Sequence, residues 1–324
     1  MWSRRSAVCY RLSNRASNLG RKTKDSGVDG LLVVDKPAGW TSHDVVAKCR
    51  WAFKQKRAGH SGTLDPDATG LLLIGFGRVT KLLPYLTALP KTYTCEIVLG
   101  RETSTLDDSG ETTCTYDMST VTLADVERVA ANFTGDIMQV PPMVSALQID
   151  GVRLHELARR GIEVERKPRP VTIYALSISR EIEPGVFAMM VTCSSGTYVR
   201  TIAADIGTAL GGGAHLRNLR RTSIGSFTAD GAVSMDGSLG TQTLCTAHHT
   251  MHDYPSAVVP DELVPLIRNG RVLPFTAVEP SALRRQPGTP EVWSVVTEAG
   301  ELLAVYERFG STDAKPAVIL PTRD

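Results

Sequence analysis

The sequence predicts an α+β protein built on a mixed, mostly antiparallel sheet with flanking helices. Three observations support this class. Segments with helical spacing of apolar residues alternate irregularly with strand-like segments, and several neighbouring strands have short connections. A hydrophobic content of 42% over 324 residues is sufficient for a large core. From about residue 247, prolines punctuate short apolar runs, which indicates a small β-rich domain.

The first 29 residues are set apart by their charge. They hold seven arginines and lysines against Asp25 and Asp29, a net charge of +5, which leaves −3 for the rest of a chain whose formal net charge is +2. Such a composition resembles an organellar transit peptide, but it lacks a clear apolar face, so a disordered basic tail or an overlong gene start is the preferred interpretation. We therefore expect a cytoplasmic protein, with an organelle as the alternative.

Domain boundaries follow from these changes in character. We expect an extension at residues 1–29, one large domain at 30–246 and the small β-rich domain at 247–324. Within the large domain, residues 31–34 predict a short strand. Thr41 or Ser42 can then cap a helix whose apolar residues fall on one face. Lys36, between strand and helix, is either a phosphate contact or an ordinary turn lysine.

Residues 57–70 predict a loop, because three glycines and Pro66 interrupt the pattern of either neighbouring element. The loop carries His60, Asp65 and Asp67. Side chains with chemical function often lie on loops that regular elements position. The alternative is a surface turn whose aspartates cap the local backbone, and spacing alone favours that alternative.

The remaining elements follow from periodicity and capping. Thr122 and Asp125 form a capping box for a helix, and residues 101–120 predict a polar connection. Other helices are predicted at 153–160, which Gly161 ends, and at 198–210. Strands are predicted at 71–74, 92–99, 171–178, 186–193, 292–297, 302–306 and 318–320.

Charge and cysteine spacing narrow the kinds of site. The folded part has no overall basic character, so binding of nucleic acid would need local clusters, for which residues 159–160, 166–169 and 217–221 are candidates. None of the six cysteines has the spacing of a metal site, so we expect no zinc, no other metal and no disulfide framework. No apolar run approaches the length of a membrane span.

Five stretches resemble, in order, the motifs of the TruB family of tRNA pseudouridine synthases. The most specific is GHSGTLDPDATGLLLIGFGRVTKLL at 59–83. The others are DKPAGWTSHDVV at 35–46, KTYTCEIVLGRETSTLDDSGE at 91–111, QVPPMVSALQIDGVRLHELARRGIEVERKPRPV at 139–171 and CSSGTYVRTIAADIGTALGGGAHLRNLRRT at 193–222. The resemblance covers roughly residues 30–230, and one departure stands out, because Ser104 occupies a position where the family often has an acid.

The resemblance implies a fold, an activity and partners. The fold would be a large mixed sheet flanked by helices, with the C-terminal part in place of an RNA-binding module of the PUA type; a purely structural β cap is the alternative. The activity would be that of an isomerase that converts the uridine at position 55, in the T-arm loop of tRNA, to pseudouridine. No cofactor is needed, and the partner is the T-arm stem-loop. We expect a monomer without an obligatory protein partner.

The resemblance also assigns roles to residues. Asp65 is the implied nucleophile, and Arg200 pairs with it so that a buried carboxylate stays ionised. Tyr93 stacks on the target uracil and takes part in proton transfer, while Leu219 packs against the other face of the base. The remaining assignments concern substrate binding: Tyr198 supports the pocket wall, His60 fills the space that flipped bases leave, and Lys36 supports the site.

Two further hypotheses stay open from the sequence. One is an RNA-binding protein that kept the fold without chemistry. Intact Asp65, Tyr93 and Arg200 argue against it, since a pure binder needs no paired nucleophile. The other is a guide-RNA-dependent synthase, which would depend on protein partners. The sequence shows no long low-complexity or lysine-rich tail of the kind that would suggest it.

Overall fold

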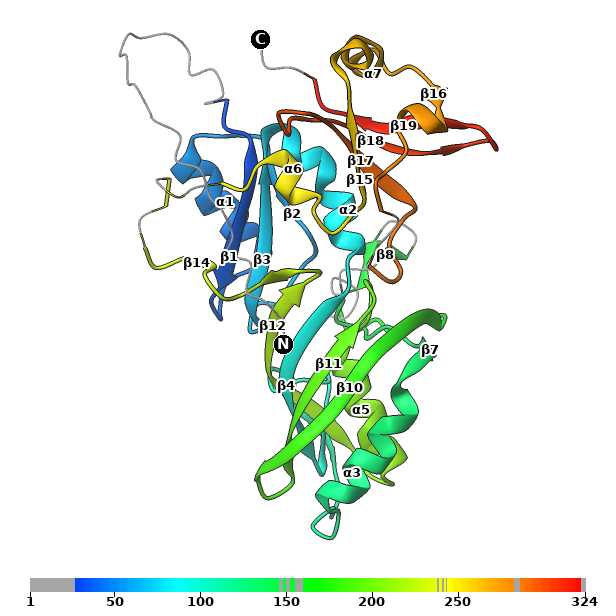
Figure 1. The fold of residues 1–324 in the computed structure, drawn as a ribbon. Helices are drawn as coiled ribbons and strands as arrows, with labels where there is room; N and C mark the ends of the chain where they lie inside the picture. The colour runs from blue at the N-terminus through cyan, green and yellow to red at the C-terminus, as the bar shows by residue number, and fades with distance from the viewer. Residues whose placement is uncertain are drawn as a thin grey trace. The chain divides into compact units, whose positions relative to one another are not determined.

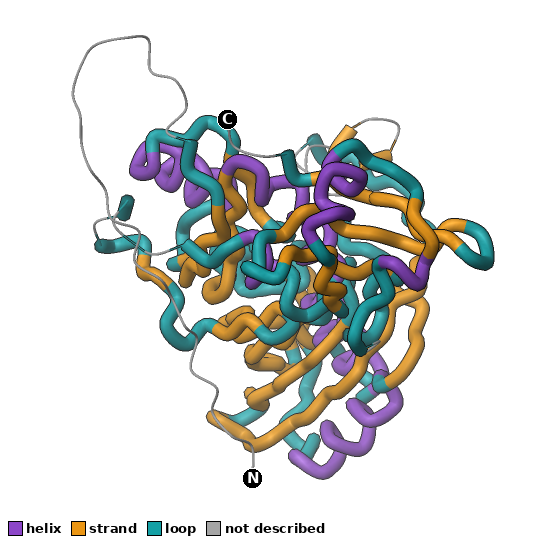
Figure 2. Tube along the Cα trace, turned by 45° about the horizontal axis from the view of Figure 1, so that its top comes forward, coloured by secondary structure: helices purple, strands orange, loops and turns teal. Residues whose placement is uncertain are grey.

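The structure, a computed structural model, describes residues 27–145, 148–149, 152–154, 160–237, 239–240, 242, 244–282 and 286–321. Strands make up most of the regular structure, and the helices are short (Figure 2). The chain divides into two compact units. The first comprises Met1–Pro66, Gly70–Leu89 and Gly225–Asp324, and the second comprises Asp67–Thr69 and Pro90–Ile224. The tail predicted at residues 1–29 lies outside the described residues as far as residue 26.

The N-terminal part of the first unit is a small sheet with a helix packed on it. Strand β3 pairs antiparallel with β1 and with the short β2, and β14 pairs parallel with β1 (Figure 1). The elements, in chain order, are β1 (Gly30–Lys36), α1 (Ser42–Phe53), β2 (Ala58–His60), β3 (Thr69–Phe76), η1 (Gly77–Leu82), α2 (Leu83–Ala88), β13 (Phe227–Thr228) and β14 (Val233–Ser234).

Helix α1 begins and packs as its sequence predicts. Thr41 is the N-cap, and its side chain and that of Asp44 form a reciprocal capping box. The apolar residues at helical spacing are buried against β1, β2 and β3. They are Val45, Val46, Cys49 and Phe53. This packing anchors α1 beside the loop that follows β2.

The C-terminal part of the first unit is the predicted β-rich region. Its sheet has the strand order β15-β17-β18-β19-β16, with a parallel β15–β17 pair and otherwise antiparallel pairs. Trp293 and Phe275 pack edge to face in its core, with ring centroids 5.5 Å apart. The elements are α6 (Ala247–Thr250), β15 (Ser256–Val259), η3 (Asp261–Leu263), α7 (Val264–Arg268), β16 (Leu273–Pro274), η4 (Phe275–Ala277), β17 (Val292–Thr297), β18 (Leu302–Phe309) and β19 (Asp313–Ile319).

The second unit is an antiparallel sheet with strand order β12-β4-β11-β10-β7. Helix α5 packs on β12 and α3 packs on β10 (Figure 1). The elements are β4 (Lys91–Leu99), β5 (Arg101–Thr103), β6 (Thr112–Thr115), α3 (Leu123–Ala130), η2 (Ala131–Phe133), β7 (Gly135–Gln139), β8 (Gln148–Ile149), β9 (Val152–Arg153), β10 (Arg169–Glu183), β11 (Val186–Cys193), α5 (Val199–Ala209) and β12 (Ala214–Ile224). Alternate residues of β4 are buried, as its sequence pattern predicts.

The predicted α+β class is confirmed, and so is the β-rich C-terminal part. Three local predictions differ from the structure. Residues 58–60, expected in a loop, form β2, because they find partners at the end of β3. The predicted polar connection at 101–120 contains the β5–β6 hairpin, and the strand β12 was not predicted. The helix predicted at 153–160 lies mostly outside the described residues, and the boundaries after residues 29 and 246 remain predictions.

Candidate active site

The loop that carries Asp65 is the connection of a short β-hairpin. Strand β2 pairs with the end of β3, with His60 opposite Ile74, and residues 61–68 join the two strands. Gly62 has a φ of 99°, a left-handed conformation that side chains disfavour, so a glycine is needed for this turn. Asp65 is half-buried, whereas Asp67 is exposed. The loop therefore presents one partly shielded carboxylate and one solvated carboxylate.

The backbone on both sides of Asp65 is held by hydrogen bonds. Ser42, in the first turn of α1, accepts a hydrogen bond from the Leu64 amide at 2.9 Å and donates to the Leu64 carbonyl at 3.3 Å. The Pro66 carbonyl accepts from the Lys36 ammonium at 2.9 Å. Because both neighbours are fixed, the Asp65 backbone has a defined position, as a pre-organised catalytic group requires.

Lys36 lies inside the fold rather than at its surface. Its side chain is 0% exposed, and its Nζ donates to the carbonyls of Pro37 at 2.9 Å, Trp40 at 2.6 Å and Pro66 at 2.9 Å. A buried ammonium is tolerated when its protons have acceptors, and here three carbonyls supply them. A fully buried ammonium fits neither interpretation from the sequence, a phosphate contact or an ordinary turn lysine. Its hydrogen bond to the Pro66 carbonyl instead connects Lys36 to the Asp65 loop.

His60 faces a second histidine that sequence reasoning missed. His60 ends β2 and is half-buried, and its ring stands edge-on to that of His43, with centroids 5.5 Å apart and an interplanar angle of 82°. His43 lies in the first turn of α1 and is exposed. Its position in the first turn of a predicted helix, after the DKPAGW motif, was the available signal. Two imidazoles therefore border the Asp65 loop.

Arg200 is buried in the first turn of α5, with 4% of its surface exposed. Its Nη1 donates to the Thr105 carbonyl at 2.8 Å and to Asp107 Oδ2 at 3.1 Å, and its Nη2 donates to the Val144 carbonyl at 2.9 Å. A buried guanidinium is costly unless its charge and its N–H groups are matched. One carboxylate and two carbonyls accept these hydrogen bonds, and together they fix the orientation of the guanidinium plane.

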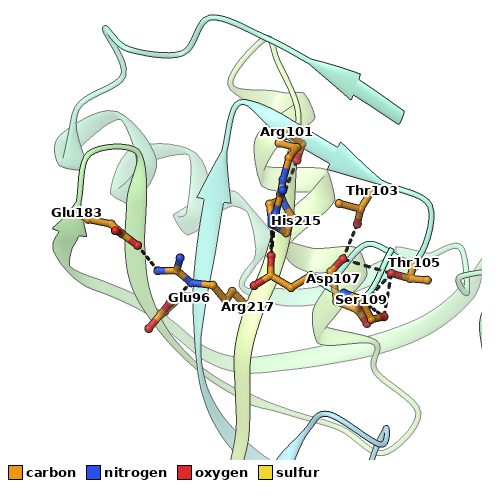
Figure 3. A network of polar contacts seen from close by, with 10 residues as sticks. Glu96, Arg101, Thr103, Thr105, Asp107, Ser109, Glu183, His215 and Arg217 are labelled. Atoms are coloured by element: carbon orange, nitrogen blue, oxygen red, sulfur yellow. Dashed lines mark hydrogen bonds and ion pairs between the residues drawn. The ribbon is translucent and has the colours of Figure 1, made fainter. Parts of the chain in front are cut away.

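Asp107 is the second residue that sequence reasoning missed. Its Oδ1 accepts hydrogen bonds from the Thr105 hydroxyl at 2.6 Å and from the Ser109 hydroxyl and amide at 2.5 and 3.1 Å (Figure 3). That leaves Oδ2 directed at Arg200. Only position 104 of this motif was weighed from the sequence, although the Asp107-Asp108 pair lies within it. Asp107 thus orients Arg200 and is itself oriented by its own turn.

A buried histidine ties this turn to the sheet. His215, on β12, is 0% exposed, and its Nδ1 lies 2.9 Å from the Arg101 carbonyl (Figure 3). Its Nε2 lies 2.8 Å from Asp108 Oδ1 and 2.9 Å from the Arg101 guanidinium. A carbonyl at one ring nitrogen and two charged groups at the other make this a dense polar network. The network fixes the strand β5 that leads into the Asp107 turn.

Tyr198 and Leu219 are placed by backbone features. Tyr198 is the N-cap of α5, and its amide and carbonyl both bond the side chain of Gln139, at 2.8 and 3.0 Å. Leu219 lies in a bulge of β12, where Asn218 adopts a left-handed φ of 54°. Bulges re-aim the side chains next to them. Both side chains are half-buried, so they line a surface rather than fill the core.

Tyr93 lies near two buried basic side chains, Lys91 and Arg221. It is 9% exposed on β4, opposite Arg221 of β12, which is itself 1% exposed. Lys91, two residues before Tyr93, shares its face of the sheet and is 5% exposed. Burial, aided by the charge of Arg221, lowers the pKa of Lys91 to about 7, although Cys193 opposes the shift. Because its pKa is lowered to about 7, Lys91 is close to half charged at neutral pH, and Arg221 is the charged group opposite Tyr93.

One of the predicted basic clusters is differently arranged. Arg217 forms ion pairs with Glu96 and Glu183, and Arg221 is buried. Because two carboxylates already compensate Arg217 and Arg221 is buried, these two residues are not solvent-facing phosphate contacts, and a phosphate role for the cluster stays a prediction. In the cluster at 166–169, Arg166 pairs with Glu163 at 3.3 Å. Arginines of both clusters therefore already have acidic partners, and other basic residues are also candidates for phosphate contacts.

The predicted site residues fall into two sets. Lys36, His60 and Asp65 belong to the first unit, and Tyr93, Tyr198, Arg200 and Leu219 belong to the second. The predicted Asp65–Arg200 ion pair joins the two sets and remains a prediction. Among the described residues, no group of three or more His, Cys, Asp or Glu is placed to hold a metal ion. What the two sets offer is a fixed carboxylate and a fixed guanidinium.

Family models match most of the chain. Residues 50–199 match the N-terminal domain of TruB family pseudouridylate synthases, and residues 200–260 match the C-terminal domain of tRNA pseudouridylate synthase B. The tRNA pseudouridine synthase B of Bacillus subtilis is 40% identical over 88% of this chain and 91% of its own length. That of Geobacter sulfurreducens is 46% identical over 64% of this chain and 68% of its own length.

Solved structures agree in fold. One is a chain of an H/ACA RNP bound to a substrate RNA containing 2′-deoxyuridine, with a TM-score of 0.67, 21% identity, and coverage of 91% of this chain and 86% of that one. A chain of a Cbf5-Nop10-Gar1 complex also has a TM-score of 0.67, with 23% identity and coverage of 91% and 84%. Within the described part of the chain, no helix has the length and apolar character needed to cross a membrane.

Proposed function

The chain belongs to the TruB family of pseudouridylate synthases, which are isomerases, and on that premise we propose that it converts uridine 55 in the T-arm loop of tRNA to pseudouridine, with Asp65 as the nucleophile. The reaction breaks the N1–C1′ bond, turns the uracil and joins C1′ to C5. The hydrogen of C5 leaves as a proton, and N1 gains one. No electrons are transferred, so the reaction needs positioned side chains and no redox group.

The observation that carries the proposal is the fixed backbone around Asp65. A carboxylate that attacks and then leaves suits a reaction that rejoins the same two partners. Asp65 is half-buried between Leu64, which Ser42 holds, and Pro66, which Lys36 holds. Attack at C1′, attack at C6 and proton removal toward a glycal are all compatible with this position.

Arg200 supplies the positive charge that keeps the nucleophile ionised. Burial raises the pKa of a carboxyl group, and a neighbouring cation offsets this effect. The guanidinium is oriented by Asp107 and by the carbonyls of Thr105 and Val144. We assign it the additional partner Asp65. In this arrangement Asp107 is a positioning residue that acts through Arg200.

Base flipping assigns the remaining roles. The reacting atoms lie inside a stacked RNA loop, so the enzyme must extrude the nucleotide and bind it in a pocket. Tyr93 stacks on the extruded uracil and takes part in proton transfer, and Leu219 covers the other face. Tyr198 supports the wall. His60, with His43 beside it, occupies the space that the flipped base leaves.

The proposal includes activity without a protein partner. The names of two structural neighbours place those proteins in an RNP and in a complex with Nop10 and Gar1. At 21–23% identity, the likeness to them concerns the fold. The curated relatives at 40–46% identity are named as tRNA pseudouridine synthase B. Greater similarity to the latter supports a stand-alone enzyme that takes tRNA as its substrate.

Purified protein and a synthetic T-arm stem-loop labelled with tritium at C5 of the target uridine test the proposal. Release of the label without any other protein or RNA is the expected result, because C5 loses its hydrogen on forming the new bond. Tight binding without release would replace the proposal with a binding protein. Release only after addition of guide RNA and partner proteins would replace it with a guided synthase.

A further inference from the structure

The solvent-facing side of α1 carries a continuous stripe of exposed residues. They recur at helical spacing, opposite the face that packs on the sheet. The stripe comprises His43, Asp44, Ala47, Arg50, Trp51 and Lys54. We call it the α1 face; the helix is labelled in Figure 1.

Trp51 is the outstanding member of the α1 face. It is 82% exposed, more than any other large hydrophobic side chain in the described residues. Tryptophan is rare at such exposure on a surface without a partner, and it is enriched where proteins bind other molecules. Its indole can stack on a nucleobase whatever the sequence, because every base presents a π-face.

The charge around Trp51 selects the class of ligand. Residues 45–57 hold Lys48, Arg50, Lys54, Lys56 and Arg57 but no aspartate or glutamate. The one acid of the α1 face, Asp44, is occupied in the capping box, where its carboxylate accepts from the Thr41 amide and hydroxyl at 2.9 and 2.6 Å. An exposed aromatic side chain in a segment that holds five cations and no acid is the combination that binds unpaired RNA, through stacking and phosphate contacts.

The α1 face begins at the candidate active site. His43, its first member, lies against His60 at the edge of the Asp65 loop. Trp51 follows eight residues later, which is about 12 Å along the helix axis. A substrate that places one nucleotide at Asp65 therefore passes close to this face with its neighbouring nucleotides or with another part of the same molecule.

We infer that the α1 face is a second contact for the substrate RNA, in which an unpaired base stacks on Trp51 and phosphates are held by Arg50 and Lys54. The identity of the RNA rests on the proposed function; the chemistry of the contact rests on the face itself. Arg50 also donates to the Ala58 carbonyl at 2.6 Å, so its guanidinium is already oriented. Lys54 is the C-cap of the helix, has a left-handed conformation and is exposed.

Equilibrium binding of two RNAs, a T-arm stem-loop and an intact tRNA, tests the inference with the full chain. Trp51→Ala should weaken binding about tenfold, the usual size of a lost base–aromatic stack, and Trp51→Phe should restore most of it. If affinity falls for both RNAs, the base that stacks on Trp51 belongs to the T-arm. If affinity falls for the tRNA alone, that base belongs to another part of the tRNA. Lys54→Asn, which suits the left-handed backbone, should reduce the salt dependence of log Kd by a slope of about one.

Ile182→Ala is the control, since Ile182 is an exposed apolar side chain of β10, 44% accessible, and Glu181 and Glu183 flank it. If Trp51→Ala binds both RNAs as Ile182→Ala does, the inference is overturned and the face serves another partner, such as a protein. Tritium release at saturating RNA is measured in parallel. If the unsubstituted protein releases no tritium but Trp51→Ala still binds RNA more weakly, the RNA contact at Trp51 is supported and only the enzymatic function is refuted.

Discussion

The loop that carries Asp65 and the helix turn that carries Arg200 are held in place by different means. Around Asp65, hydrogen bonds hold the backbone of both neighbouring residues: Ser42 bonds Leu64 and Lys36 bonds Pro66. Around Arg200 the contacts go to the side chain, which is bonded directly by Asp107 and by two carbonyls.

This difference indicates separate tasks. A nucleophile must approach and leave the substrate, and a backbone that is fixed on both sides positions it for both steps. A counter-charge must stay where it is, so support through its own N–H groups is appropriate. Substitutions should therefore slow the reaction for different reasons in the two regions. At Asp65 they remove the reacting group, and around Arg200 they disturb the orientation of the guanidinium.

The largest effect should come from Asp65→Asn. The amide cannot act as an anionic nucleophile, so tritium release should fall by about 10⁴-fold or more, as for other removed nucleophiles. The hydrogen bonds of Leu64 and Pro66 do not involve the substituted group, so the loop should stay folded, which thermal unfolding would check. Asp67→Asn, two residues away and exposed, is the control and should remain close to wild type. Equal losses in both variants would refute the assignment of Asp65.

Lys36→Met should combine a loss of stability with a loss of rate. It leaves three carbonyls, including that of Pro66, without their ammonium donor, which should cost about 3 kcal/mol of unfolding free energy. The loosened loop should also slow the reaction about 100-fold, because Asp65 is no longer pre-positioned. Urea unfolding and single-turnover rates measure the two effects. Arg180→Met, which also replaces an exposed cation, should show neither.

Asp107→Asn should have a moderate effect. The amide keeps the size of the side chain but weakens the charge-assisted bond to Arg200, which is worth about 2 kcal/mol, or roughly 30-fold in rate if all of it acts on the transition state. Asp108→Asn, at the next residue, changes a carboxylate that faces Arg101 and His215 instead. A rate loss for Asp108→Asn as large as that for Asp107→Asn would contradict the special role of Asp107.

The last prediction concerns stability and pH rather than activity. Because Lys91 has its pKa lowered to about 7 from 10.5, the unfolded chain binds a proton between these pH values that the folded chain does not. Stability should therefore rise with pH across this window, by up to about 1.4 kcal/mol per pH unit, and level off above it. Urea unfolding at pH 7, 8 and 9 should show this rise relative to Lys91→Met. Parallel curves would show that Lys91 is charged in the folded protein.

Much of the Asp65 region was predictable, because its signals are local. The capping box of Thr41, the apolar spacing of α1 and the glycines of the loop all lie within a short stretch of sequence. The motif at 59–83 then identified Asp65 among several turn aspartates. What could not be predicted was the burial of Lys36, since its acceptor Pro66 lies 30 residues away.

The Arg200 region was less predictable, because its contacts are long-range. Gln139 bonds Tyr198 from 59 residues away, and Asp107 bonds Arg200 from 93. Such pairs leave no periodic pattern in the sequence. Strand β12 was missed for a different reason: residues 214–216 are all buried, and Asn218 interrupts the strand with a bulge, so the alternation typical of a half-buried strand is absent.

The most direct test of the central claim, that Asp65 and Arg200 work as one pair, is a double-mutant cycle. Single-turnover tritium release would be measured for Asp65→Glu, Arg200→Lys and the double variant, each at saturating stem-loop RNA. A working pair predicts that the double variant is about as slow as the slower single variant, because either change already disrupts the same interaction. Losses that multiply would show that the two residues act independently, and would contradict the account.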